Sequence, residues 1–71
     1  MLRLTFTDEK GQVKVLGDAK EDGELYQSVY NHARRLFIHP TVIPLGHLDS
    51  KSCYIVGQTK SGCKYEISNL D

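Results

Sequence analysis

Apolar and polar residues alternate in two short stretches near the start of the chain. Leu4 and Phe6 are separated by one threonine, and Val13 and Val15 by one lysine. A period of two predicts half-buried β-strands. The polar segment 8–11 between them ends in a glycine, which is typical of a tight turn. We therefore predict a hairpin with a four-residue loop, in which Phe6 faces Val13, Leu4 faces Val15 and the apolar side chains share one face.

A helical period follows a polar connector, residues 17–23. The connector offers two candidate helix caps, namely Asp18 with Glu21 three residues later, and Asp22. Beyond it, apolar residues recur at the spacing of one amphipathic helix, which we expect to end before Pro40. The apolar stripe consists of Leu25, Tyr26, Val29, Tyr30, Ala33, Leu36 and Phe37.

The end of this stripe is expected to attach the helix to the sheet. Large apolar side chains at the helical period are usually buried. We therefore expect Leu36 and Phe37 to pack beside Leu4, Phe6 and Val15.

Three more extended segments follow the helix. The first, Thr41–Leu45, contains Pro44, which limits it to an edge or to the end of a strand. The other two, residues 53–56 and 63–67, flank a polar turn that ends in Gly62. This arrangement predicts a second hairpin.

The register of the second hairpin stays open between two alternatives. A four-residue loop places Tyr54 and Val56 beside Tyr65 and Ile67, whereas a three-residue loop that ends at glycine places Ile55 beside Ile67.

The predicted order is β-β-α-β-β-β, which indicates an α+β fold: a small antiparallel sheet with one amphipathic helix packed on one face. The 71 residues are enough for a single domain, residues 1–71. Hydrophobic residues make up 39% and charged residues 25%, a balance typical of globular proteins. Because so small a core gives modest stability, a homodimer is one expected state.

The charges balance overall but not along the chain. Nine basic and nine acidic residues give a net charge of zero, so no global field attracts nucleic acid or an anionic membrane. The first 24 residues carry four basic and six acidic groups, and the rest carry five basic and three acidic groups. A local basic face is therefore expected in the alternative function, a nucleic-acid-binding module. Its residues would be Arg34, Arg35, Lys51, Lys60 and Lys64.

No apolar run approaches the length of a membrane span or of a signal peptide. We therefore expect a cytoplasmic protein without a membrane partner. Cys53 and Cys63 are too few for a disulfide scaffold and lie opposite each other in neither hairpin register. Both are expected to be free thiols.

Motifs for metal binding or catalysis are missing from the sequence. The candidate zinc ligands contain no close pair of the kind that structural zinc sites use. They are His32, His39, His47, Cys53 and Cys63. The acidic residues around the predicted helix start complement the helix dipole, which explains them without catalysis. We expect surface histidines, no metal, no cofactor and no catalytic residue, and hence not an enzyme.

The helix carries the best candidate for a partner surface. Tyr26, Tyr30 and Arg34 are spaced by four residues, so they form one ridge, and Arg35 adjoins it. Tyrosine and arginine are the residues most enriched at binding hot spots. The main functional prediction is therefore a small non-catalytic protein-interaction module, of adaptor or inhibitor type, with an unidentified protein partner.

Overall fold

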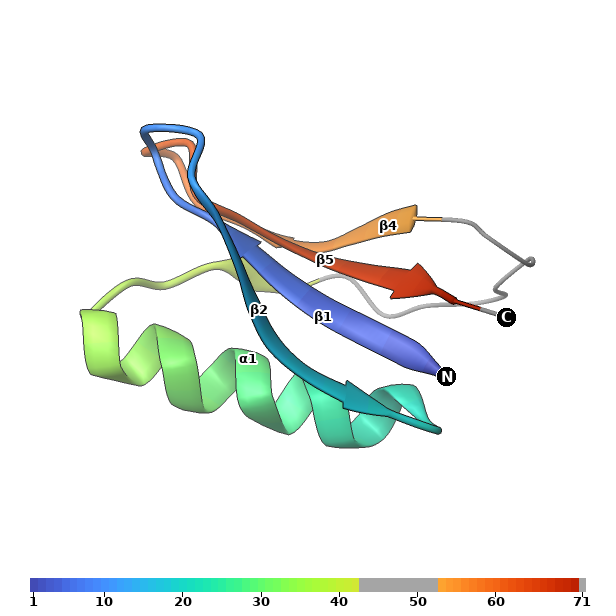
Figure 1. The fold of residues 1–71 in the computed structure, drawn as a ribbon. Helices are drawn as coiled ribbons and strands as arrows, with labels where there is room; N and C mark the ends of the chain where they lie inside the picture. Colours follow the sequence, from blue (N-terminus) through green and yellow to red (C-terminus); the bar gives the residue numbers. More distant parts are fainter. Residues whose placement is uncertain (43–52, 71) are drawn as a thin grey trace.

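Five strands form one antiparallel sheet, and helix α1 lies across one of its faces (Figure 1). The computed structural model describes residues 1–42 and 53–70. The elements are β1 (Leu2–Thr7), β2 (Val13–Ala19), α1 (Asp22–Leu36), β3 (Thr41–Val42), β4 (Cys53–Gln58) and β5 (Lys64–Asn69). The strand order is β2-β1-β5-β4-β3. The predicted α+β fold class and element order are confirmed.

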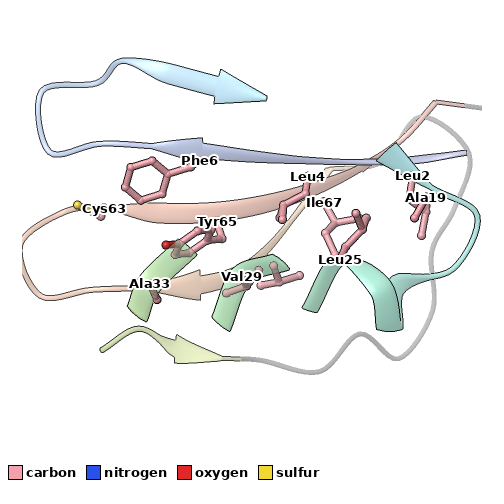
Figure 2. Packing of buried hydrophobic residues seen from close by; sticks show 11 residues of the cluster. Leu2, Leu4, Phe6, Ala19, Leu25, Val29, Ala33, Cys63, Tyr65 and Ile67 are labelled. Atoms are coloured by element: carbon pink, nitrogen blue, oxygen red, sulfur yellow. The ribbon is translucent and has the colours of Figure 1, made fainter. Parts of the chain in front are cut away.

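The hydrophobic core lies between α1 and the sheet (Figure 2). Its fully buried large side chains are Leu4, Val29, Val56, Tyr65 and Ile67. Every second residue of β1 is buried, and so are Tyr65 and Ile67 of β5, as the period of two requires. The Tyr65 ring packs so closely over β4 that a Cβ atom at Gly57 would lie 3.3 Å from its Cδ2 atom.

The first hairpin has a different register from the predicted one. Thr7 pairs with Val13 and Thr5 with Val15, so both valines lie on the face of the sheet opposite the helix. There they are 66% and 53% exposed. The prediction that they face Phe6 and the core is wrong, because the loop has five residues and a one-residue slip reverses every side chain.

The two hairpin turns share one backbone geometry. Asp8 N–H donates to the Gln12 carbonyl and Thr59 N–H to the Cys63 carbonyl, each at 2.9 Å. Each turn has a glycine with positive φ at its fourth position, 87° and 101°. Side chains fix the fifth residue: Asp8 Oδ1 accepts the N–H groups of Lys10 and Gln12 at 2.9 Å, and Thr59 Oγ1 accepts that of Cys63 at 3.1 Å.

Halfway along β2 a bulge shifts the register of the first hairpin by one residue. Leu16 is the additional residue there, and beyond it Ala19 pairs with Leu2 and is buried. Residues 17–19, predicted as part of a polar connector, therefore belong to the strand.

Neither predicted cap begins the helix. Asp18 lies in β2 and accepts a hydrogen bond from Arg3 Nε at 2.8 Å on the sheet surface. Asp22 is already the first helical residue, and Glu21 occupies the N-cap position without a side-chain hydrogen bond.

The second hairpin combines parts of both predicted registers. Beside the turn, Gly57 pairs with Tyr65, and beyond a bulge at Val56, Tyr54 pairs with Ile67. The pairing of Tyr54 with Ile67 is that of the predicted four-residue loop. The pairings beside the turn are those of the predicted three-residue loop. Of the two predicted loop lengths, four residues is wrong, whereas three residues ending at Gly62 gives the observed pairings beside the turn, where Thr59 N–H donates to the Cys63 carbonyl.

The helix ends earlier than expected, at Leu36, in a left-handed turn. Phe37 has φ 56°, its N–H donates to the Arg34 carbonyl at 3.3 Å, and Ile38 N–H donates to the Ala33 carbonyl at 3.1 Å. This Schellman motif turns Ile38 toward the core and Phe37 outward. Phe37 is 90% exposed and Leu36 48% exposed. The prediction that they anchor the helix to the sheet is wrong, and Ile38 packs against the core instead.

Candidate functional site

Two of the hollows that border α1 lie on opposite sides of the buried residues that attach the helix to the sheet. The first, called the apolar groove here, has a volume of about 420 Å³ and a mostly apolar lining. It is lined by Tyr30, Ala33, Arg34, Phe37, Ile38, His39 and Pro40. The second, called the cationic pocket, has a volume of about 310 Å³ and a mostly polar lining. It is lined by Lys14, Val15, Leu16, Ser28, Asn31, His32 and Arg35.

The four predicted surface residues do not stay together. Tyr30 and Arg34 line the apolar groove, whereas Arg35 lines the cationic pocket on the other side of the helix. Tyr26 is partly buried against the core. The structure adds Phe37 to the surface of Tyr30 and Arg34, because the helix ends in a left-handed turn that the sequence reasoning did not anticipate.

His32 is not the surface histidine that was expected. Its ring centroid lies 4.6 Å from that of Phe6 and 5.7 Å from that of Tyr65. His32 Nδ1 lies 2.8 Å from the Tyr65 hydroxyl, which is the polar end of a fully buried side chain. In the sequence His32 follows Val29 by three residues, which places it at the margin of the apolar stripe. This position was the feature of the sequence that could have indicated its contact with the core.

The His32–Tyr65 pair is held in its uncharged form. Burial, together with the positive charges of Lys14 and Arg35, lowers the pKa of His32. Burial raises the pKa of the Tyr65 phenol to about 12. Both side chains are therefore neutral near pH 7, so the contact between them is a hydrogen bond rather than an ion pair.

The basic residues of the alternative function do not form one face. Lys64 pairs with Thr7 on the sheet face opposite the helix, and its Nζ lies 3.3 Å from Glu66 Oε1. Lys60 lies in the second turn, and the two arginines point to opposite sides of α1. Lys51 lies outside the described residues.

The two cysteines have different environments. Cys63 is buried, whereas Cys53 is exposed, and both are free. Cys53 Sγ donates to Glu66 Oε2 at 2.9 Å, and this contact raises the pKa of the thiol. Such a neighbour disfavours the thiolate that a nucleophilic cysteine needs.

No group of three His, Cys, Asp or Glu side chains in residues 1–42 and 53–70 is arranged to hold a metal ion. His39 lines the apolar groove, and His47 lies outside the described residues.

Among the elements that the structure describes, none covers the face of the sheet opposite α1. One row across it consists of Val15, Thr5, Glu66 and Ile55, which are neighbours on adjacent strands. Val15 is 53% and Ile55 40% exposed. The homodimer expected from the sequence stays a prediction.

Comparison of the chain with protein-family models, with curated proteins and with solved structures gives no match. Within the described part of the chain, no helix has the length and apolar character needed to cross a membrane. We therefore infer function from the two sides of α1.

Proposed function

We propose that this protein is a small non-catalytic protein-interaction module, of adaptor or inhibitor type, that binds its partner through the apolar groove. The observation that carries the proposal is the position of Phe37. Its side chain is 90% exposed beside Tyr30 and Arg34, at one end of a mostly apolar hollow.

Folding gives no reason for a phenylalanine at this position. Glycine is the usual residue after a helix end in the left-handed conformation, since other residues lose about 1–2 kcal/mol there. An exposed ring recovers little of that loss through burial in the free protein. Left-handed residues other than glycine are concentrated at functional sites, which supports a binding role for Phe37.

The chemistry of the groove indicates the kind of partner segment. Tyr30, which is 51% exposed, and Phe37 offer ring surface to an apolar side chain. Arg34 is exposed and forms no ion pair within the described residues. Its guanidinium can therefore donate two parallel hydrogen bonds to one carboxylate, a bidentate contact. We expect a segment that presents an apolar anchor beside an acidic residue.

We further propose that the protein works in the cytoplasm. The free thiols of Cys53 and Cys63 support a reducing compartment.

The test is affinity capture from a native extract treated with nuclease, followed by affinity measurement on the captured protein. We expect Tyr30→Ala to weaken binding by more than about 1 kcal/mol, the usual threshold for an energetically relevant contact. Arg34→Lys should also weaken binding, because lysine cannot form the bidentate contact. The matched control is Arg35→Lys, the same change on the other side of the helix, with no expected loss. Circular dichroism establishes that each variant is folded.

Two results would contradict the proposal. One is a folded Tyr30→Ala variant that binds the captured protein as well as the parent does. The other is capture that depends on nucleic acid and falls steeply with salt, since that dependence reports phosphate contacts.

A further inference from the structure

The cationic pocket gathers basic groups of two separate elements into one small hollow. Lys14 comes from β2, and His32 and Arg35 come from α1. Their proximity is also electrostatic, because the charges of Lys14 and Arg35 both act on His32. Among residues 1–42 and 53–70 no carboxylate lines this hollow, and its remaining polar side chains there are Ser28 and Asn31. Two cations and a histidine, gathered in a lining to which the described residues contribute no carboxylate, form a site for an anion.

The neutral groups at the pocket are arranged to donate. Asn31 Oδ1 already accepts a hydrogen bond from Gln27 Nε2 at 3.3 Å, which leaves the Asn31 amide N–H₂ group as a donor. The Tyr65 hydroxyl is protonated at neutral pH and lies 2.8 Å from His32 Nδ1, so one tautomer of His32 accepts a hydrogen bond from it at that nitrogen. In that tautomer His32 Nε2 carries the proton, and it makes no hydrogen bond to any residue in the described ranges.

We propose that the cationic pocket binds the terminal phosphate of a phosphate monoester through Lys14, His32, Asn31 and Arg35. A volume of about 310 Å³ holds a phosphate group and the first atoms of the molecule that carries it. Two permanent cations match a dianion, and the Arg35 guanidinium fits two phosphate oxygens at once.

A single terminal phosphate suits this surface better than a nucleic-acid backbone. A polyanion needs a continuous basic track. Lys64 lies on the opposite face of the sheet beside Glu66. On the other side of His32, a neighbouring groove is lined by Asp8 and Glu9 of the first turn, which repel a chain of phosphates. The pocket is also distinct from the apolar groove, so either proposal can fail without the other.

The first test is a titration of the parent protein with sodium sulfate, followed by NMR at constant ionic strength. Sulfate stays a dianion throughout the pH range in which histidine titrates. We expect saturable shifts of the Asn31 and His32 signals and a rise in the pKa of His32. The charged groups around that ring are Lys14, Arg35, Asp8 and Glu9, and the phenol of Tyr65 stays neutral.

Matched arginine variants locate the site. Arg35→Gln should weaken sulfate binding about tenfold, because it removes charge-assisted hydrogen bonds, whereas Arg34→Gln should leave binding unchanged. Should Arg35→Gln fail to fold, Lys14→Gln on the exposed edge strand gives the same readout.

A comparison of O-phosphoserine with a phosphoserine heptapeptide distinguishes the source of the phosphate. Equal affinities indicate a small-molecule phosphate, and tighter binding of the peptide indicates a phosphorylated protein. Linear, non-saturating shifts with sulfate, or equal losses in the Arg34 and Arg35 variants, would overturn the proposal. So would tighter binding of an oligothymidylate than of O-phosphoserine at this pocket.

Discussion

The two sides of α1 differ in chemistry although one helix supplies both. On the side of the apolar groove, Tyr30 and Phe37 expose their rings. On the side of the cationic pocket, His32 packs against the sheet and Arg35 stands beside Lys14. Arg34 and Arg35 are adjacent in sequence but serve opposite sides, since successive helical residues are rotated by about 100°. A pair of neighbouring arginines is therefore not one basic patch.

The difference between the two sides shows which exposed residues folding explains. His32 has a structural role in its contacts with Phe6 and Tyr65. Phe37 has none of comparable extent, because its ring is 90% exposed and its backbone is in a conformation that favours glycine. The side without a structural explanation is the stronger candidate for partner binding.

The largest expected effect is on the free energy of unfolding, and its sign differs between the buried residues of α1 and the exposed end of the helix. Leu25→Ala removes a side chain that is only 2% exposed, and we expect a loss of about 2–5 kcal/mol in the free energy of unfolding. Phe37→Gly should have the opposite sign. It relieves about 1–2 kcal/mol of left-handed strain, which exceeds the roughly 0.5–1 kcal/mol that glycine adds to the entropy of the unfolded chain.

Urea denaturation measures both variants. A Phe37→Gly variant that is less stable than the parent by more than about 1 kcal/mol would mean that the ring is packed, and the comparison between the two sides would then fail.

A smaller effect tests the structural role of His32. The folded protein holds the pKa of His32 below its ordinary value of 6.5, mainly through burial, so the unfolded chain binds the proton more readily. The stability that His32 contributes is present above about pH 6.5 and is lost as the pH falls toward the lowered pKa.

The measurement is the free energy of unfolding between about pH 7.5 and pH 5, compared with that of His32→Gln. The parent should lose more stability than the variant as the pH falls. Parallel curves would indicate a solvent-exposed histidine. The lowered pKa values of Asp18 and Glu66 also weaken the fold in acid, but both proteins share that effect.

The helix shows how far the sequence alone predicts this structure. The stripe through Leu25, Val29 and Ala33 was predicted and is buried, because a helical period repeats over several turns. The end of the helix was not predicted, because the left-handed residue is Phe37 and no glycine marks it. Once the chain reverses there, Ile38 replaces Phe37 in the core.

The first hairpin shows a second limit. Its strands were predicted from alternation, but the register depends on one additional loop residue, Gln12, whose N–H is held by the Asp8 carboxylate. Contacts distant in sequence are less visible still, as the His32–Tyr65 hydrogen bond joins residues 33 positions apart. The candidate site was therefore predicted only in part, through Tyr30 and Arg34, while Phe37 required the structure.

The most direct test of the account is the affinity of Phe37→Gly for the captured partner, measured by calorimetry beside its thermal stability. If Phe37 is kept for binding, the variant folds at least as stably as the parent and binds more weakly by about 2 kcal/mol or more, the range of a hot spot. A variant that is stable and binds the partner with unchanged affinity would contradict the proposal that the apolar groove is the binding surface.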